Sequence, residues 1–96
     1  MPGAHVYILA SRRNGTLYTG MSGDLGDRLF KHRTGIGSQF VKKYNVTMLV
    51  YFEWHVLYVE AMRRETSIKK WKRAWKIALI ESVNPDWRDL TESLLA

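Results

Sequence analysis

Two tyrosines near the N-terminus have the spacing of neighbours on a β-hairpin. Tyr7 lies in the apolar segment 5–10 and Tyr18 in the segment 16–21, and the Asn-Gly pair at 14–15 favours a tight turn between them. On adjacent antiparallel strands both phenols could lie on one face of the sheet. A phenol has a pKa near ~10, so a role as a base requires a nearby cation or metal. Core packing is the ordinary alternative for a strand tyrosine.

A second pair of side chains lies one helical turn apart. Asp24 can cap a helix over residues 25–33, in which Leu25 and Leu29 mark the buried stripe. Arg28 and His32 are also four residues apart, so they should project together along the margin of that stripe. A permanent cation beside a titratable imidazole suits phosphate binding and assisted proton transfer. An exposed pair without chemistry is the alternative.

A third candidate is a carboxylate on a helix that should run from His55 to about Val83, with a bend between residues 71 and 76. At about 100° per residue, Glu65 falls inside the apolar arc and faces the core. A carboxylate there needs a cation, a metal or a set of donors. An internal salt bridge to an arginine and a metal ligand are both open readings.

The predicted strands and helices that carry these residues indicate a small α/β (α+β) fold, with a three-stranded, mainly antiparallel sheet flanked by helices. Residues 1–96 should form a single domain of this kind. The third strand should span residues 46–53, whose apolar centre predicts cover on both faces. A short helix is expected over 39–44, and after Asn84-Pro85 a last helix should start over 86–90. Leu90, Leu94 and Leu95 should close the core.

The net charge favours a polyanionic partner, nucleic acid first. Lys and Arg number 15 and Asp and Glu number 9, which gives +6. The whole excess lies between residues 63 and 76, where Glu65 is the only acid. Trp71 and Trp75 within this stretch could stack on bases or anchor the core. The candidate nucleic-acid-binding residues are Arg63, Arg64, Lys69, Lys70, Lys72, Arg73 and Lys76. A solvated helix face is the alternative.

Composition also narrows the function classes. Without cysteine the chain has no disulfides, no thiolate nucleophile and no Cys-containing zinc site. The N-terminal residues lack a signal-peptide pattern, and no apolar run approaches the ~20 residues of a membrane span. We therefore expect a cytoplasmic protein without membrane contact.

Taken in order along the chain, these residues resemble the GIY-YIG nuclease family. The two naming tripeptides of the family read 5-HVY-7 and 18-YTG-20 here. The family arginine and histidine match Arg28 and His32, and the metal-binding glutamate matches Glu65. Asn84 is the candidate for a later family asparagine, and the segment 65–90 looks like the small stand-alone bacterial members.

The chain departs from the family pattern without losing a functional side chain. His5, Val6 and Thr19 replace a glycine and two isoleucines of the tripeptides. Met21 stands where some members carry a lysine, so lysine-assisted activation of the second tyrosine is not available. The separate DNA-recognition domains of homing and restriction relatives have no counterpart in these residues, which leaves target choice unexplained.

The resemblance implies endonuclease hydrolysis of phosphodiester bonds with one divalent cation, Mg²⁺ or Mn²⁺. Glu65 would hold the metal and Arg28 would neutralise charge on the phosphate. Tyr7 would activate the attacking water, as a phenolate or through water on the metal. Tyr18 and His32 would orient the phosphate or water and relay a proton, with His32 as the alternative base. Gly20 and Asn84 would support the site.

The resemblance leaves the substrate and the alternative function open. DNA is favoured over RNA, and structured or branched DNA in repair or recombination is the expected substrate setting. The alternative is a nucleic-acid-binding module of the same fold, weakly catalytic or inactive, that binds through residues 63–76. The oligomeric state is not predicted.

Overall fold

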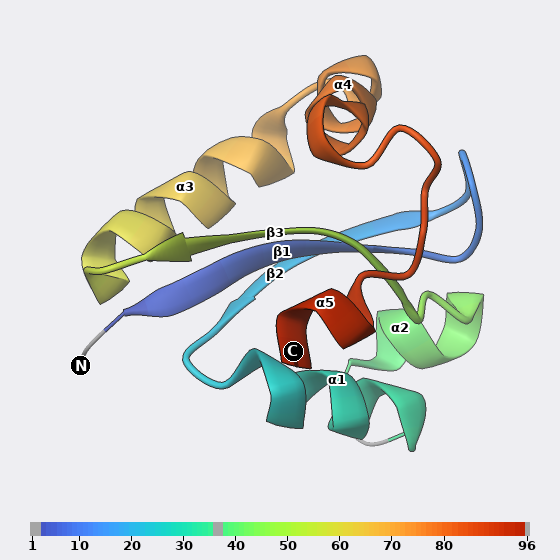
Figure 1. Ribbon diagram of the computed structural model, residues 1–96, viewed down its shortest axis with the longest axis horizontal. Coiled ribbons are helices and arrows are strands. Elements are labelled where there is room, and N and C mark those ends of the chain that lie inside the picture. Colours follow the sequence, from blue (N-terminus) through green and yellow to red (C-terminus); the bar gives the residue numbers. More distant parts are fainter. Residues whose placement is uncertain (1–2, 36–37, 96) are drawn as a thin grey trace.

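The computed structural model describes residues 3–35 and 38–95, which form one antiparallel sheet with helices on both faces (Figure 1). The strand order is β2-β1-β3, so β1 is central. This confirms the predicted fold class. The elements in chain order are β1 (Ala4–Ala10), β2 (Leu17–Ser22), α1 (Leu25–Arg33), α2 (Gln39–Tyr44), β3 (Met48–His55), α3 (Tyr58–Lys70), α4 (Arg73–Val83) and α5 (Thr91–Leu95).

Alternation along β1 divides the core into two layers. Val6 and Ile8 point into the cluster beneath α3 and α4, whereas Tyr7 and Leu9 point into the cluster formed with α1, α2 and α5. Figure 1 shows these two groups of helices on opposite sides of the sheet. The strand buried on both faces is therefore β1, because β3 becomes partly exposed from Phe52 onward.

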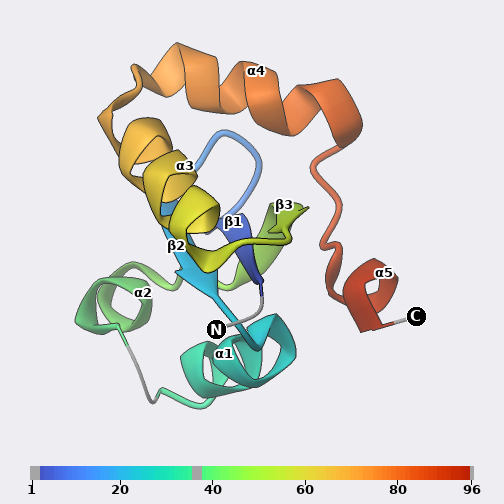
Figure 2. The same cartoon turned by 90° about the vertical axis from the view of Figure 1, so that its left-hand side faces the viewer.

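Several predicted boundaries move by two or three residues. The third strand begins at Met48 and extends to His55, and the helix after it begins at Tyr58. The predicted bend is confirmed as a break, since α3 ends at Lys70 and α4 begins at Arg73. Trp71 and Lys72 adopt extended backbone between the two helices (Figure 2).

The prediction of a helix over 86–90 is wrong, and Asn84 gives the reason. Its side-chain amide donates to the carbonyls of Val50 and Arg88, and its Oδ1 accepts from the Arg88 backbone N–H at 3.0 Å. These bonds tie up backbone groups that a helix would use, and Trp87 adopts a left-handed φ of 54°. The last helix is α5 instead; Leu90 and Leu94 pack against the core, but Leu95 is exposed.

Replacement of Asn84 tests this anchoring role. We expect Asn84→Ala to lower the free energy of unfolding by about 2–4 kcal/mol, because it leaves buried backbone groups without partners. The exposed Asp86→Ala change should alter it by less than about 0.5 kcal/mol. Urea unfolding of the two variants measures the difference. Equal stabilities would contradict the role given to Asn84.

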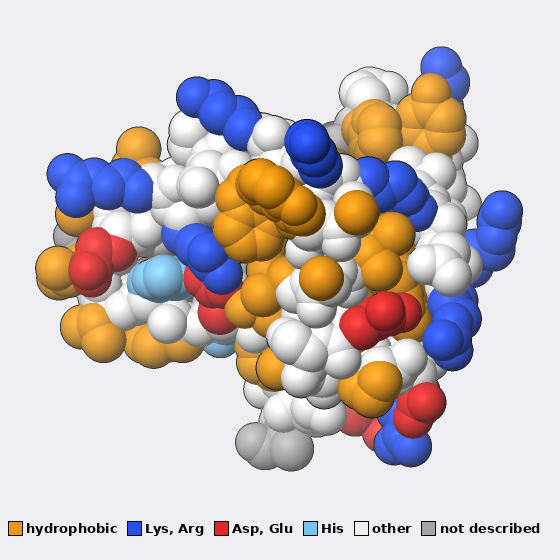
Figure 3. Space-filling model, turned by 90° about the horizontal axis from the view of Figure 1, so that it is seen from above, with side chains coloured by type: hydrophobic (Ala, Val, Ile, Leu, Met, Phe, Trp, Pro, Cys, Tyr) orange, Lys and Arg blue, Asp and Glu red, His pale blue; other side chains and the backbone are white. Residues whose placement is uncertain are grey.

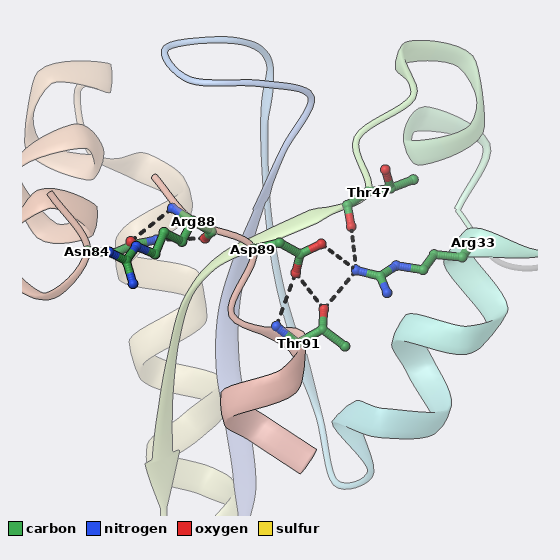
Figure 4. A network of polar contacts seen from close by, with 6 residues as sticks. All are labelled: Arg33, Thr47, Asn84, Arg88, Asp89 and Thr91. Atoms are coloured by element: carbon green, nitrogen blue, oxygen red, sulfur yellow. Dashed lines mark hydrogen bonds and ion pairs between the residues drawn. The ribbon is translucent and has the colours of Figure 1, made fainter. Parts of the chain in front are cut away.

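One arginine fixes the end of α1 to the C-terminal segment. Arg33 Nη2 donates to the Asp89 carboxylate at 2.9 Å, to Thr91 Oγ1 at 2.7 Å and to the Thr47 carbonyl at 3.2 Å (Figure 4). The Leu90 N–H also donates to the Leu49 carbonyl in β3. These contacts hold α1, which carries two candidate site residues, against the lower face of the sheet.

In the described part of the chain, no helix combines the length and the apolar character needed to cross a membrane.

Candidate active site

Tyr7 and Tyr18 lie on one face of the sheet, as predicted. Tyr7 pairs with Gly20 and Leu9 pairs with Tyr18, so the two phenols are diagonal neighbours on adjacent strands. Their ring centroids are 6.5 Å apart. Tyr7 is fully buried, whereas Tyr18 is partly exposed at the edge strand β2. Of the two phenols, Tyr18 is the one that a substrate can reach directly in this structure.

Gly20 makes room for the Tyr7 hydroxyl. A Cβ atom at position 20 would lie 2.6 Å from Tyr7 Oη and 2.7 Å from Tyr7 Cζ, closer than non-bonded atoms approach. It would also lie 3.1 Å from Cε2 of Tyr18. Gly20 therefore has a steric role in the site, as the absence of a side chain allows the Tyr7 phenol to lie over the backbone of β2.

His32 turns inward from α1 and contacts Tyr7. Its Nε2 lies 3.3 Å from Tyr7 Oη, and the side chain is buried together with Leu25 and Leu29. Arg28 is exposed. The prediction that Arg28 and His32 stand together at the margin is therefore wrong for His32, because α1 is rotated so that the imidazole belongs to its buried face. The His32 Nδ1 atom has no hydrogen-bond partner among the described residues.

Burial keeps both members of this pair uncharged at neutral pH. Burial raises the pKa of the Tyr7 phenol far above its ordinary value, as do the charges of Tyr18 and Glu65, while Arg28 acts in the opposite direction. Burial also lowers the pKa of His32, and the Arg28 cation lowers it further. A neutral imidazole can accept the Tyr7 proton, whereas a standing Tyr7 phenolate is disfavoured.

The neutral state of His32 predicts a loss of stability in acid. Because its pKa is lower in the folded than in the unfolded chain, stability is complete above about pH 6.5 and falls as the pH drops toward the folded value. His5 acts in the same direction. We expect His32→Asn to lose less unfolding free energy than wild type between about pH 7.5 and 5.5 in urea titrations. Equal losses in the two proteins would contradict a buried neutral His32.

Glu65 lies at the side of α3 rather than in the core. Ala61 and Ile68 are buried as the helical wheel predicts, but the Glu65 side chain is 19% exposed, and its Oε2 is 3.5 Å from Lys69 Nζ. The predicted alternative of a salt bridge to an arginine is wrong, because the partner is this lysine one turn away. α3 packs on β2 and β1 (Figure 2), and the Glu65 charge acts on Tyr7.

The donor set fits a weakly held magnesium-type cation. Among the described residues no group of three or more His, Cys, Asp or Glu side chains gathers around a point. Glu65 instead offers one carboxylate, 19% exposed, whose charge acts on Tyr7, and Lys69, which is 52% exposed, can move away from it. Mg²⁺ is commonly held by one or two carboxylates and keeps several waters. A single carboxylate is therefore compatible with this cation class.

The basic stretch 63–76 is divided between α3 and α4, and two of its arginines bind other parts of the fold. Arg64 Nε donates to both carboxylate oxygens of Glu53, and its guanidinium lies 5.1 Å from the Trp71 ring centroid. Arg73 donates to the carbonyls of Asn14 and Gly15 in the hairpin turn. Figure 3 shows Lys and Arg side chains over this face with hydrophobic side chains between them.

Asn84 lies apart from the other candidate residues. Two aromatic residues near the site were not predicted from the sequence. Asn84 bonds to β3, on the opposite edge of the sheet from β2, and so it supports the fold. Phe40 lies 6.0 Å from Tyr18 between ring centroids, and Tyr44 lies 4.8 Å from Phe40. Their spacing of four residues on the predicted helix 39–44 is the sequence feature that could have identified them.

The candidate residues have the arrangement expected of GIY-YIG nuclease domains. Two tyrosines lie on neighbouring strands, with a glycine beneath one of them. An arginine lies on the next helix and a glutamate on the helix after the third strand. Residues 3–78 match the family model described as the GIY-YIG catalytic domain, and the chain belongs to this family. The matched region contains every candidate site residue except Asn84.

Small bacterial proteins are similar over most of the chain. A UPF0213 protein of Staphylococcus epidermidis is 34% identical over 77 residues, covering 80% of this chain and 94% of the relative. Another from Staphylococcus saprophyticus is 36% identical over 76 residues, covering 79% and 93%. The solution NMR structure of a UPF0213 protein from Bacillus halodurans has a TM-score of 0.58 at 29% identity and covers 94% of this chain and 95% of that one.

Proposed function

We propose that this protein is a metal-dependent endonuclease that hydrolyses phosphodiester bonds of DNA in the cytoplasm. The observation that carries the proposal is the setting of the Tyr7 hydroxyl, which lies over Gly20 and against His32 within the influence of Arg28 and Glu65. A phenol that is subject to the charges of a permanent cation and a carboxylate is suited to phosphoryl chemistry. Family membership supports the same reaction class.

Glu65 is the residue that would hold the divalent cation, Mg²⁺ or Mn²⁺. When bound, the cation polarises the phosphate and stabilises the leaving 3′ oxygen. Glu65 reaches solvent beside β2, so its carboxylate is accessible to an ion and to a substrate strand. The Lys69 ammonium occupies the same carboxylate in the absence of a metal and would be displaced toward a substrate phosphate.

Arg28 would bind the scissile phosphate. Its guanidinium is exposed on α1 and lies near enough to influence both Tyr7 and His32. Arginine keeps its charge at any working pH and can offer two parallel N–H donors to phosphate oxygens. Neutralising the charge that builds up there in the transition state can contribute a few kcal/mol.

Tyr7 and His32 would remove the proton from the attacking water as a pair. The Tyr7 hydroxyl would accept the proton of the water while it donates its own proton to His32 Nε2, which lies 3.3 Å away. This exchange avoids a free phenolate, which burial disfavours. Because Tyr7 is fully buried, side chains beside its hydroxyl would have to move before water reaches it. Tyr18 would orient the water or phosphate from the edge strand.

A nucleic-acid-binding module without cleavage is the second candidate function. It is favoured by the cations of the 63–76 stretch that bind no other helix, strand or turn among the described residues: Arg63, Lys69, Lys70, Lys72 and Lys76. Such side chains neutralise phosphates without reading bases, so binding should be sensitive to salt and largely independent of sequence. Both candidates predict binding, and only the first predicts cleavage.

A substrate panel separates the two functions. Purified protein is incubated with single-stranded, duplex and forked DNA and with RNA of the same sequence, in Mg²⁺, in Mn²⁺ and in EDTA. We expect cleavage of DNA that requires the metal, with the forked DNA cleaved faster than the duplex. Binding of these substrates without cleavage of any of them would establish the binding module instead.

A further inference from the structure

Next to the candidate active site, α2 presents two aromatic rings to solvent. The helix begins where Ser38 Oγ accepts from the Val41 N–H and ends at Asn45, which has a left-handed φ of 54°. Val41 is buried in the core, whereas Phe40 is 41% exposed and Tyr44 is 44% exposed. One buried residue thus anchors a short helix whose large rings face outward.

These rings continue the aromatic row that begins inside the site. The Tyr18 ring lies 5.7 Å from His32 on one side and 6.0 Å from Phe40 on the other, with an angle of 32° between the Tyr18 and Phe40 planes. The Phe40 and Tyr44 centroids are 4.8 Å apart. Figure 2 shows α2 beside α1 on the same side of the sheet. Because Phe40 and Tyr44 are exposed, the outer end of the row is open to solvent.

Positive charge accompanies the exposed rings. Lys43 Nζ lies 5.4 Å from the Tyr44 ring centroid, and Lys42 is exposed beside it. Neither lysine pairs with a carboxylate within residues 3–35 and 38–95. Aromatic faces next to lysines that neutralise phosphates are the combination by which proteins bind unpaired nucleotides. A partner that is aromatic and anionic therefore matches this surface.

We propose that Phe40 and Tyr44 form a stacking subsite for an unpaired nucleobase that neighbours the scissile phosphate. The inference rests on the proposed nuclease function, since Tyr18 borders both the cleavage site and the subsite. A base inside a duplex already stacks on its neighbours, so only an unpaired or splayed base can lie on these rings. The subsite thereby fixes the register of the strand in the active site.

Abasic substitution in the substrate tests the subsite. The scissile bond of a single-stranded DNA oligonucleotide is mapped, and each nearby nucleotide is then replaced in turn by an abasic one. For the wild type we expect kcat/KM to fall roughly tenfold at one position. Phe40→Ala should cleave the intact oligonucleotide with a similar loss and should show no further loss at that abasic position. Additive losses, or no sensitive position, would overturn the proposal.

Matched variants separate stacking from folding. Phe30→Ala removes a ring that is 65% exposed on α1 but outside the aromatic row, and it should retain wild-type kcat/KM and the abasic pattern. Phe40→Leu keeps an apolar side chain without the aromatic face and should behave like Phe40→Ala. Wild-type behaviour of Phe40→Leu would show that the rings serve packing or a protein partner instead.

A binding measurement keeps the subsite testable if cleavage fails. Oligonucleotides with 2-aminopurine at successive positions are titrated with wild type and Phe40→Leu in EDTA, and fluorescence quenching reports stacking on a ring. We expect wild type to quench more strongly than the variant, whether or not either protein cleaves DNA. Equal quenching by the two proteins would overturn the subsite and leave the nuclease assignment to the metal-dependent assay.

Discussion

Glu65→Gln is expected to abolish metal-dependent DNA cleavage, with a loss of at least about 10³-fold in kcat. The amide has the shape of the carboxylate but not the charge that would hold the cation. Folding should be nearly unaffected, because within the described residues Glu65 loses one ion pair, the one to the half-exposed Lys69, which is worth at most about 1 kcal/mol. Initial rates over a Mn²⁺ titration and urea unfolding measure the two effects.

Glu60→Gln is the matched control, because Glu60 lies on the same helix but is exposed in its first turn. This variant should cleave like wild type and bind DNA with similar affinity. Binding by Glu65→Gln should also persist within about threefold at fixed salt, since removing a negative charge does not weaken contacts to phosphates. Equal cleavage rates for the two variants would remove Glu65 from the mechanism.

Gly20→Ala is expected to cost roughly 10²-fold in kcat, although the added methyl group removes no charge from the site. Its Cβ would lie 2.6 Å from Tyr7 Oη, so the phenol must move away from His32. Displacing a fully buried ring should also lower the unfolding free energy by about 1–3 kcal/mol. Single-turnover cleavage and urea unfolding of the same preparation give both values.

Gly26→Ala is the control for this effect. A Cβ at position 26 of α1 would have Leu95 Cδ2 as its nearest neighbour at 3.5 Å, an ordinary contact. Alanine inside a helix is favoured over glycine by roughly 0.5–1 kcal/mol, so this variant should be slightly more stable than wild type and equally active. Wild-type activity in Gly20→Ala would show that the position of the Tyr7 hydroxyl does not matter for cleavage.

The sequence predicts the helices most accurately where local capping and hydrophobic patterns agree with tertiary packing. α1 and α2 have the predicted bounds, because Asp24 and Ser38 cap their first turns. A buried stripe marks α1, and the single buried Val41 anchors α2. The segment after Asn84 could not be predicted, since its path depends on side-chain bonds to a strand distant in sequence and on the left-handed backbone of Trp87.

The sequence predicts which candidate side chains share a face of the sheet, but it does not predict how deeply each one is buried. The period of two along a strand places Tyr7 and Tyr18 together without any tertiary information. The depth of His32 and the partial exposure of Glu65 depend on how α1 and α3 rotate against the sheet, which a helical wheel does not specify. The predicted helix faces therefore misplaced two of the candidate residues relative to the surface, His32 and Glu65.

The basic residues of the stretch 63–76 do not all have the same role, although the sequence predicts one nucleic-acid-binding surface. Arg64 and Arg73 stabilise the fold through Glu53 and through the hairpin turn, so they should contribute little to binding of phosphates. Lys42 and Lys43 on α2 lie outside the predicted stretch but beside the aromatic row. Contacts to nucleic acid are therefore expected on both sides of the candidate active site.

The central claim is that water attacks a DNA phosphodiester at this site with a divalent cation. The most direct measurement is single-turnover cleavage of a defined DNA oligonucleotide in H₂¹⁸O with Mg²⁺ or Mn²⁺, with the products analysed by mass spectrometry. The account predicts one ¹⁸O atom on a new 5′-phosphate and an unlabelled 3′-hydroxyl, because the 3′ oxygen is the leaving group. Products with a 3′-phosphate, or no cleavage with either metal, would contradict it.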